Sequence, residues 1–455
     1  MTSPNPQQEV QEFAFLMKHD WDDRARQDAK WFINTLRFQQ TDEEFDQTGA
    51  FEVHRLVTVD LPLLTQGRDP KSQRVLEIGC GAGRMTKHLA DLFSEVVGVD
   101  VSGEMVRQAQ ARLRDVGNVQ LHETSGVDFA ELPDEHFDLI LSAYVFQHVP
   151  SAAVIRANLE DAWRVLKPGG ALRFQTNAIT AFDFDTVEKD TWTGASFPET
   201  ELREFAAEKD AQLISIIGAE TQYCWTTLRK RTRPAGATPQ YTTGPLEIVN
   251  FGRADDFSIK QIPTHGEHAH LGLLVRGLSL EEIDANSLAV EFAGERALPQ
   301  YVGPCGRNDA DGQPLVQVNQ KVPAGLLGGA IEVRLVTLAE EASPPVTVEL
   351  QEPQPVIPKI VNVRNVRDEQ ADVLTRGKDM EAWLFVEGLD LTADPGNTRV
   401  KIGERVVKPT HISLQPANAV YLVKIPLPTN IDPGEKELHL FFGALESPGW
   451  SVQIR

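Results

Sequence analysis

Hydrophobic residues recur with two different periodicities along this chain. From about Thr86 to Lys230, short β-branched runs alternate with segments of helical spacing, a pattern typical of βαβ units around a parallel sheet. Residues 232–245 are rich in Pro, Gly and Thr. Beyond them strand-like alternation dominates and helical spacing nearly disappears. The pattern therefore predicts an α/β N-terminal half and an all-β C-terminal half.

Helical spacing also precedes the βαβ region. Residues 11–38 place aromatic and aliphatic side chains, Trp21 and Trp31 among them, between charged residues. Thr41 and Glu44 have the spacing of a capping box, which predicts the start of a second helix. The first helix could cover a face of the sheet or form a lid over a ligand site.

The C-terminal half contains an internal repeat. The run Val275–Leu280 recurs as Val386–Leu391, and Gly294-Glu295-Arg296 recurs as Gly403-Glu404-Arg405, each about 110 residues later. Each copy consists of short strands punctuated by Gly and Pro, which predicts two β-sandwiches. The copies resemble early-set immunoglobulin-like domains in pattern and spacing. Their predicted role is that of spacers or assembly domains that contact a partner or a second copy, and a glycan-binding role is the alternative.

The charge balance excludes some partners. The chain has 455 residues, 66 acidic against 44 basic, and a net charge of −22. Such a charge repels phosphate, so no nucleic-acid partner is predicted, and the cluster Arg229, Lys230, Arg231 and Arg233 is interpreted as a solvated strand end. The three cysteines lack the spacing of a metal site or a disulfide framework. No apolar stretch suits a signal peptide or a membrane span, so a cytoplasmic protein is predicted.

The strongest local pattern is a strand that runs into a glycine-rich turn. The apolar residues Val75–Ile78 lead into Gly79, Gly81 and Gly83, and a helical segment follows. Glycines let the backbone turn tightly and approach a ligand closely. A dinucleotide fingerprint would need glycine where Arg84 stands, so this turn suits a ligand that is held by an amino-acid portion rather than by a pyrophosphate.

Acidic residues follow at strand ends. Asp100 ends the next apolar run, Val96–Val99, at a spacing that suits hydrogen bonds from both hydroxyls of a ribose. Asp128 follows Gly126 and Val127, where a carboxylate could accept a hydrogen bond from an adenine amine. The run Phe137–Leu141 predicts a fourth strand. Further expected features are a helix end and turn at Leu166–Gly170, a fifth strand at Ala171–Gln175, and sixth and seventh strands at Ile214–Gly218 and Thr221–Arg229.

In this order, the motifs from Glu77 to Gly170 resemble those of class I S-adenosylmethionine (SAM)-dependent methyltransferases of the small-molecule type, over roughly residues 40–230. The resemblance implies an α/β Rossmann-like domain with a seven-stranded sheet whose last strand is antiparallel. It implies SAM as cofactor and methyl transfer to oxygen, nitrogen, sulfur or carbon. The expected acceptor is a small molecule or a glycan that is methylated on oxygen or nitrogen. By position, the implied cofactor-binding residues are Glu77, Gly79, Gly81 and Gly83 for the methionine moiety, Asp100 for the ribose, Val101, Ser102, Met105, Val127 and Asp128 around the adenine, and Ser142 near the sulfonium.

Several of the predicted site residues have an alternative interpretation. Ser102 and Met105 could instead cap and pack a helix. His148, after the fourth strand, is the candidate general base, although it could also brace its loop, and His122 is a weaker candidate. The segment 177–199 is expected to form part of the acceptor wall with Trp192 and the acids Asp183, Asp185 and Asp190, which could equally be solvated loop charges.

The predicted organisation has four parts. They are a helical lid at 1–40, a methyltransferase domain at 41–231, and immunoglobulin-like repeats at 246–350 and 356–455. A fragment of residues 1–232 is expected to bind SAM by itself, because every cofactor motif precedes residue 230. Two other functions fit the same scaffold: an aminopropyltransferase that uses decarboxylated SAM, and a non-enzymatic protein that binds SAM or a glycan.

Overall fold

The computed structural model describes most of the chain. The described residues are 6–35, 39–180, 191–192, 194–232, 239–266, 268–323, 326–351, 357–365, 373–374, 381–389, 393, 398–415, 420–427, 431–443 and 445–455. Asp183, Asp185, Asp190, Arg233 and residues 390–391 of the repeat lie outside them. The chain divides into two compact units, of which the first contains residues 1–257, 271–321 and 331–347 and the second contains the remainder. Within the described residues, no helix combines the length and apolar character needed to cross a membrane.

Helices open the chain, as the spacing predicts. Helix α1 spans Pro6–Ile33 and α2 spans Asp42–Val53. The capping box is confirmed, because the backbone N–H of Glu44 donates to Thr41 Oγ1 and the backbone N–H of Thr41 donates to Glu44 Oε2. A short π-helix, η1 (His54–Thr58), continues α2 and leads to α3 (Leu61–Thr65) and the 3₁₀ turn η2 (Pro70–Ser72).

Seven strands between residues 74 and 230 lie in the order β3-β2-β1-β4-β5-β7-β6. Their bounds are β1 (Arg74–Ile78), β2 (Glu95–Asp100), β3 (Val119–Glu123), β4 (Phe137–Ser142), β5 (Leu166–Thr176), β6 (Ala211–Ile217) and β7 (Cys224–Lys230). The strands from β3 to β5 run parallel, and β7 runs antiparallel to β5 and β6. The helix end expected at Leu166 is confirmed, because Leu166 is the C-cap of α6 (Ala152–Val165). The turn expected at Lys167–Gly170 is instead part of β5, which begins at Leu166, where Leu166 pairs with Phe137.

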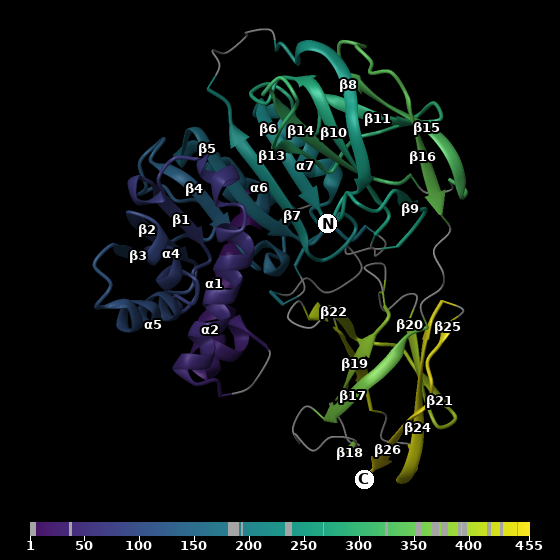
Figure 1. The fold of residues 1–455 in the computed structure, drawn as a ribbon. Helices are drawn as coiled ribbons and strands as arrows, with labels where there is room; N and C mark the ends of the chain where they lie inside the picture. The colour runs from purple at the N-terminus through teal and green to yellow at the C-terminus, as the bar shows by residue number, and fades with distance from the viewer. Residues whose placement is uncertain are drawn as a thin grey trace. The chain divides into compact units, whose positions relative to one another are not determined.

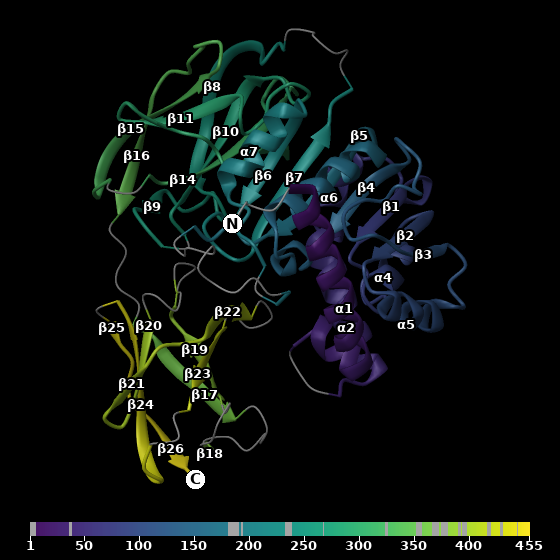
Figure 2. The same cartoon turned by 180° about the vertical axis from the view of Figure 1, so that it is seen from behind.

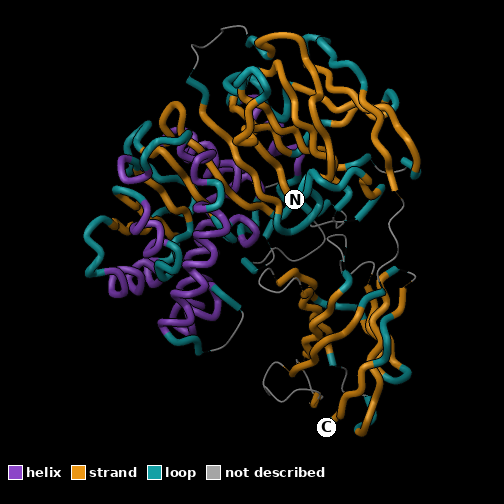
Figure 3. Tube along the Cα trace, in the orientation of Figure 1, coloured by secondary structure: helices purple, strands orange, loops and turns teal. Residues whose placement is uncertain are grey.

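Helices connect these strands and bury the sheet. They are α4 (Thr86–Leu92), α5 (Gly103–Leu113), the 3₁₀ turn η3 (Phe146–His148), α6 (Ala152–Val165) and α7 (Glu199–Glu208). One core cluster joins α2, η1, α3 and α4 to the sheet through residues such as Val57, Leu89 and Leu141. Figure 3 shows that the helices belong to the part of the chain before β6, since strands and loops make up the described residues after α7.

The sheet continues beyond β6. Strand β13 (Tyr301–Asn308) pairs antiparallel with β6 at Tyr301 and Ser215, and the backbone N–H of Ile216 donates to the carbonyl of Gln300 at 2.7 Å. Strands β14 (Pro314–Lys321), β10 (His270–Leu278) and β8 (Thr242–Arg253) follow, which makes an eleven-stranded sheet (Figure 1). Residues on both sides of the connector at 232–245 therefore belong to one sheet.

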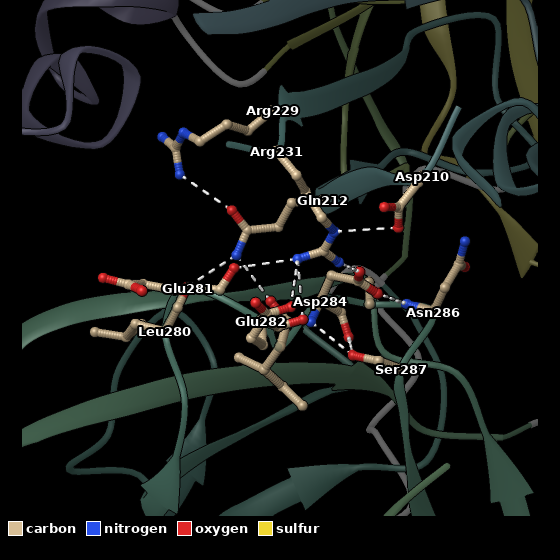
Figure 4. A network of polar contacts seen from close by, with 12 residues as sticks. Asp210, Gln212, Arg229, Arg231, Leu280, Glu281, Glu282, Asp284, Asn286 and Ser287 are labelled. Carbon is tan, nitrogen blue, oxygen red and sulfur yellow. Dashed lines mark hydrogen bonds and ion pairs between the residues drawn. The ribbon is translucent and has the colours of Figure 1, made fainter. Parts of the chain in front are cut away.

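Buried polar contacts reinforce this joint (Figure 4). The side chains of Arg231 and Asp284 form an ion pair and are 8% and 6% exposed. Arg231 Nη1 also donates to the carbonyls of Glu281 and Glu282, each at 3.1 Å. Gln212 Nε2 on β6 donates to two carbonyls of the same loop, those of Leu280 and Ile283, each at 2.9 Å. The basic cluster expected to be solvated thus contributes a buried cation to the joint.

The two copies of the repeat share one topology. In the first copy, β8, β10, β14 and β13 lie side by side, and β11 (Leu288–Phe292) pairs with β12 (Glu295–Ala297) and β15 (Gly329–Thr337). In the second, β17 (Lys359–Asn365), β19 (Glu381–Glu387), β23 (Val420–Pro426) and β22 (His411–Gln415) follow the same order, and β20 (Thr398–Ile402) pairs with β21 (Arg405–Val407) and β24 (Gly434–Phe442). The parallel pair β9 (Gln261–Pro263) and β16 (Val346–Gln351) corresponds to β18 (Val373–Leu374) and β26 (Trp450–Ile454); the hairpin partner β25 is Leu445–Glu446.

One hydrogen-bond motif recurs in both copies. The backbone N–H of Leu335 donates to Ser343 Oγ at 3.0 Å, and that of Leu440 donates to Ser447 Oγ at 2.9 Å. In the second copy both sheets contribute to one apolar core, which includes Leu384 and Val423 from one sheet and Leu438 from the other. Figure 2 shows the strands of these two sheets, β17, β19 and β23 in one and β20, β21 and β24 in the other. The two copies therefore share their strand order and a local hydrogen-bond motif, and the second copy buries one core between its two sheets.

Candidate active site

The glycine turn after β1 leaves no room for side chains. The backbone N–H groups of Gly79 and Cys80 both donate to the carbonyl of Val99, which ties the turn to β2. Gly79, Gly81 and Gly83 all have φ between 54° and 78°, a conformation that favours glycine. A Cβ on Gly79 would lie 2.2 Å from Val145 Cγ2. The turn is therefore shaped by glycine at the carboxyl end of the strand, where ligands bind in open α/β sheets.

Asp100 is held at the adjacent strand end. Its Oδ2 accepts from the backbone N–H of Gly81 at 2.8 Å, and its Oδ1 accepts from that of Ser102 at 2.9 Å. Desolvation by the surrounding protein raises the pKa of Asp100 to about 6, against the opposing effect of these two hydrogen bonds. The carboxylate is thus fixed in place beside the glycine turn, in the position expected for a ribose-binding acid.

Glu77 lies beneath the turn rather than on its surface. Its side chain is buried, and Thr86 Oγ1 donates to Glu77 Oε2 at 2.6 Å. Burial raises the pKa of Glu77 to about 7, so the carboxyl is partly protonated near neutrality. The hydrogen bond also ties β1 to the first turn of α4. Its predicted contact with the methionine moiety stays a prediction.

The residues expected around adenine divide into two groups. Ser102 caps α5, because its hydroxyl accepts from the backbone N–H of Met105 at 3.1 Å and donates to Asp22 Oδ1 at 2.6 Å. Met105 is buried in a cluster with Ala25 and Ala82. These contacts favour the capping and packing roles that the sequence left open. A cofactor contact by either side chain stays a prediction.

The second group lies after β3. Asp128 is exposed, and its Oδ1 accepts from Ser125 Oγ at 2.9 Å. Val127 is half-buried, and a Cβ on the neighbouring Gly126 would lie 2.7 Å from Val101 Cγ2. Val101 and the loop at 126–128 are therefore adjacent. This arrangement agrees with the predicted adenine edge and leaves the contact itself a prediction.

Ser142 ends β4 with an unsatisfied hydroxyl. The residue is buried, and its Oγ has no hydrogen-bond partner among the described residues. Buried hydroxyls without a partner cost free energy and are uncommon in folded proteins. Together with the glycine turn and Asp100, this orphaned hydroxyl fits a polar ligand that lies along the strand ends. The residues present therefore fit SAM.

Helix α1 covers this edge, as the lid interpretation requires. A Cβ on Gly81 would lie 2.7 Å from Ile33 Cδ1 of α1. Further along α1, Thr191 Oγ1 donates to Asp20 Oδ2 at 2.6 Å, and the Trp31 and Trp192 rings stack with centroids 6.4 Å apart. The helix contacts α5 and α6 as well. It therefore holds residues 191–192 and covers the glycine turn at the same time.

Both ring nitrogens of His148 have hydrogen-bonding contacts. The carbonyl of Trp192 accepts from Nδ1 at 2.7 Å, and Nε2 lies 3.2 Å from Gln147 Nε2, which can donate to it. The rings of Trp21 and Trp192 lie 5.4 and 5.2 Å from the imidazole. These contacts favour the bracing role over that of a general base. His122 lies on β3, which is at the far edge of the sheet from β5.

Replacing His148 by alanine should therefore lower thermal stability by several degrees, since the ring hydrogen-bonds to Trp192 and Gln147 and packs against Trp21. Any methyl transfer that survives should keep the wild-type dependence on pH. Differential scanning fluorimetry and a pH–rate curve on this variant measure both effects. An unchanged melting temperature combined with a turnover about 100-fold lower would instead identify His148 as the base.

Sequence reasoning missed a second polar cluster at this edge. Glu52 on α2, Arg55 on η1 and Tyr144 after β4 hydrogen-bond one another, with Arg55 Nη2 donating to Glu52 Oε2 at 2.7 Å and Tyr144 Oη donating to the same oxygen at 3.1 Å. Tyr144 has φ of 62°, which is unusual for a residue with a side chain. Tyr144 lies about ninety positions after Glu52 and Arg55, so no local motif marks the cluster.

Known proteins are similar to the region that contains the site. Residues 76–174 match the family model described as a methyltransferase domain. A ubiquinone biosynthesis O-methyltransferase from Hydrogenovibrio crunogenus is 27% identical over 134 residues, which are 29% of this chain and 54% of that protein. One from Xanthomonas axonopodis pv. citri is 32% identical over 126 residues, 27% of this chain and 51% of that protein. The chain thus spans about half the length of these relatives.

Solved structures include the N-methyltransferase NodS from Bradyrhizobium japonicum in complex with S-adenosylhomocysteine (SAH). It is 19% identical, with a TM-score of 0.35, 47% of this chain and 98% of that chain covered. A SAM-dependent methyltransferase from Aquifex aeolicus is 19% identical, with a TM-score of 0.30 and 42% and 98% of the two chains covered. The family match and the curated relatives agree with the glycine turn and Asp100. The chain contains a SAM-dependent methyltransferase domain, which the family model places at residues 76–174.

Proposed function

We propose that the protein transfers the methyl group of SAM to a hydroxyl or amine of a small-molecule or glycan acceptor. The observation that carries this proposal is the Asp100 carboxylate, held by two backbone N–H groups beside the glycine turn. Such a fixed acid can accept from both ribose hydroxyls, while the turn admits the methionine moiety. When bound, SAM supplies an electrophilic methyl group. The protein's part is to align an acceptor with it and to exclude water.

The acceptor side is formed by the ends of β4 and β5 and by the lid. The curated relatives are named ubiquinone biosynthesis O-methyltransferases, which supports an oxygen acceptor for this chain. Trp21 and Trp31 on the lid helix α1, together with Trp192, contribute aromatic surface on this side. Aromatic side chains of this kind suit a ring or another apolar body on the acceptor.

Isothermal titration of the full chain tests the proposal. SAM and SAH should bind with one-to-one stoichiometry, and SAH should appear when a competent acceptor is added. Decarboxylated SAM separates the aminopropyltransferase alternative, because such an enzyme would prefer it. Tight binding of decarboxylated SAM together with no binding of SAM or SAH would overturn the proposal. SAM binding without turnover across acceptor classes would favour the non-enzymatic alternative.

SAM affinity should depend on pH through Asp100. In the proposed complex the ionised carboxylate accepts hydrogen bonds from both ribose hydroxyls. Because the pKa of Asp100 is about 6, the side chain is mostly protonated at pH 5 and mostly ionised at pH 7. Affinity should therefore rise with pH and be roughly tenfold higher at pH 7 than at pH 5. Titrations at both values measure this difference. In Asp100→Asn the rise should shrink, and an undiminished rise would assign the titration to another group, such as Glu77.

The proposal also covers the segments on either side of the methyltransferase domain. We assign a lid to residues 1–40, the catalytic domain to 41–231, and immunoglobulin-like repeats to 246–350 and 356–455, with oligomer or partner contacts through the repeats. The shared strand order of the two copies supports their common origin. Light scattering on the full chain at several concentrations tests the oligomer. A monomer at every concentration would remove that part of the proposal.

A further inference from the structure

The strands β13 and β22 begin in the same way in the two copies of the repeat. In the first copy, the backbone N–H of Gln300, just before β13, donates to the carbonyl of Asn319 on β14 at 2.9 Å. In the second copy, the backbone N–H of Thr410, just before β22, donates to the carbonyl of Lys424 on β23 at 2.8 Å. Thr410 and β22 are therefore the counterparts of Gln300 and β13, about 110 positions later.

The outer edge of this strand is paired in the first copy. The carbonyl of Gln300 accepts from the backbone N–H of Ile216 at 2.7 Å, and Tyr301 pairs with Ser215, so β6 extends the sheet of the first copy. In the second copy, β22 is a terminal strand of a four-stranded sheet, and within the described residues it pairs with β23 alone. The edge that holds β6 in one copy is therefore open in the other.

The other terminal strands of the described sheets have features that protect an edge. A charged side chain, a proline or a very short strand disfavours pairing with another chain. These features are a charged residue in β3 (Glu123), β8 (Glu247), β12 (Glu295), β17 (Lys359) and β21 (Arg405), Pro263 in β9, and a length of two residues in β18.

Strand β22 has none of these features. It spans five residues, His411–Gln415, with the sequence His-Ile-Ser-Leu-Gln and no Asp, Glu, Lys, Arg or Pro. Burial lowers the pKa of His411 to about 4, with a further lowering by the charge of Lys424, so the imidazole is neutral near pH 7. An uncharged edge of this kind is a template for another strand.

The strand that occupies this edge must itself have an open side and no charge. Strand β6 is already paired with both β7 and β13. Among the terminal strands of the described sheets, β22 alone has an open side, five residues, and neither charge nor proline. Two identical strands can pair antiparallel about a two-fold axis, and such a contact closes with two chains and leaves no edge for a third.

We infer that β22 pairs antiparallel with β22 of a second copy of this chain, so that the two four-stranded sheets join into one sheet across a two-fold axis. This inference rests on the proposed oligomer contacts through the repeats and specifies their surface and their partner. The contact repeats between chains what β6 and β13 do within one chain. It also removes an unprotected edge that would otherwise favour aggregation.

Strand pairing of this length gives a weak dimer. Two five-residue strands bury less surface than the ~1,600 Å² of a standard protein–protein interface. We therefore expect a dissociation constant on the order of 10 µM, with mostly monomer at about 1 µM and mostly dimer at about 100 µM. Sedimentation velocity of the full chain measures this constant, in about 0.3 M salt to screen the net charge of −22.

Hydrogen exchange of the full chain at the same two concentrations locates the contact. Amide groups of β22 should exchange at least about fivefold more slowly at the higher concentration, because pairing protects them. Those of the terminal strands β3 and β8 should exchange at the same rate at both. A dimer in which another terminal strand is protected and β22 is not would overturn the inference.

Distances between spin labels test the geometry. One protein carries a nitroxide at Thr410→Cys and another at Arg364→Cys on β17, each with Cys305→Ser because Cys305 is only half-buried. With strands ~4.8 Å apart, the two β17 strands of the joint sheet lie about 34 Å from each other, whereas the labels at 410 should lie within about 25 Å. A longer distance for 410 than for 364 would contradict the pairing.

A lysine at the open edge should weaken the dimer. Thr410 is exposed, and its Oγ1 donates to Glu381 Oε1 at 3.1 Å, so Thr410→Lys has a carboxylate to pair with in the folded monomer. The dissociation constant should rise at least about tenfold, since an edge lysine opposes strand pairing. Thr243→Lys, at an exposed residue of β8, is the matched control and should dimerise like the wild type. Equal dissociation constants for Thr410→Lys and the wild type would overturn the inference.

The outcomes separate this inference from the proposed function. A monomer at every concentration removes both the inference and the proposed oligomer contacts. A dimer that forms without protection of β22 overturns only the assignment of the surface. Titration with SAM and SAH tests methyl transfer independently, because failure of the proposed function appears there as absent cofactor binding whatever the oligomeric state.

Discussion

Replacing Asp284 by alanine should lower the free energy of unfolding of the first unit by about 3–5 kcal/mol, which is the usual effect of removing one partner from a buried ion pair. Asp284 and Arg231 are both nearly inaccessible to solvent, so the guanidinium would stay buried without its partner. Asp284 Oδ1 also accepts from the backbone N–H of Asn286 at 2.7 Å, and this contact would be lost as well. Chemical denaturation followed by tryptophan fluorescence measures the change.

Two further variants define the cause. Asp284→Asn keeps an acceptor for the backbone N–H of Asn286 but removes the negative charge. It should therefore separate the contribution of this hydrogen bond from that of the ion pair. The double variant Arg231→Met with Asp284→Leu removes both charges and should recover part of the lost stability. Asp311→Ala, with a side chain that is 79% exposed, is the matched control and should have little effect. A loss below about 1 kcal/mol in Asp284→Ala would show that the joint contributes little.

Asp100→Ala should weaken SAM binding by about 3 kcal/mol, or roughly a hundredfold, because two charge-assisted hydrogen bonds from the ribose would be lost. The effect should be on binding rather than on folding of the whole unit. The same carboxylate also accepts from Gly81 and Ser102, so part of the effect comes from loosening the glycine turn. Calorimetric titration of SAM into wild type and variant at pH 7.5 measures it.

Asp115→Ala provides the control, since its side chain is 89% exposed and lies after the end of α5. It should bind SAM like the wild type. Asp100→Asn retains the shape of the side chain and one acceptor oxygen, so its affinity should fall between those of wild type and Asp100→Ala. Equal affinity in all four proteins would mean that the ribose does not bind at Asp100.

Local patterns were sufficient for much of the methyltransferase region. The apolar runs predict β1, β2 and β4 closely, because buried parallel strands are continuous hydrophobic segments. The capping box at Thr41 and the glycine conformations at Gly79 and Gly81 depend only on neighbouring residues. Asp100 could be placed because strand ends in such a sheet meet at one edge.

Long-range pairing could not be predicted in the same way. Composition placed a boundary at the connector, but strand β13 completes the edge of β6, and Arg231 on one side of the connector pairs with Asp284 on the other. A fragment that ends at residue 232 keeps every predicted cofactor-binding residue yet loses these partners. We therefore expect it to be less stable than the sequence alone suggested. The repeat itself was visible, because duplicated turns keep their Gly and Glu-Arg residues.

The polar cluster of Glu52, Arg55 and Tyr144 could not be predicted from the sequence for a related reason. Tyr144 lies about ninety residues after Glu52 and Arg55, and none of the three belongs to a recognisable motif. Ring and guanidinium contacts of this type depend on the packing of α2 against the loop after β4. Sequence reasoning instead selected His148, a residue type that is common in catalysis, whose ring nitrogens contact the carbonyl of Trp192 and the side chain of Gln147.

A structure of the full chain in complex with SAH would test the cofactor assignment most directly. We expect both ribose hydroxyls within hydrogen-bonding distance of the Asp100 carboxylate, the homocysteine portion over Gly79 and Gly81, and the sulfur beside the unsatisfied hydroxyl of Ser142. SAH bound at another place on the protein, or at this edge with its ribose away from Asp100, would contradict the assignment.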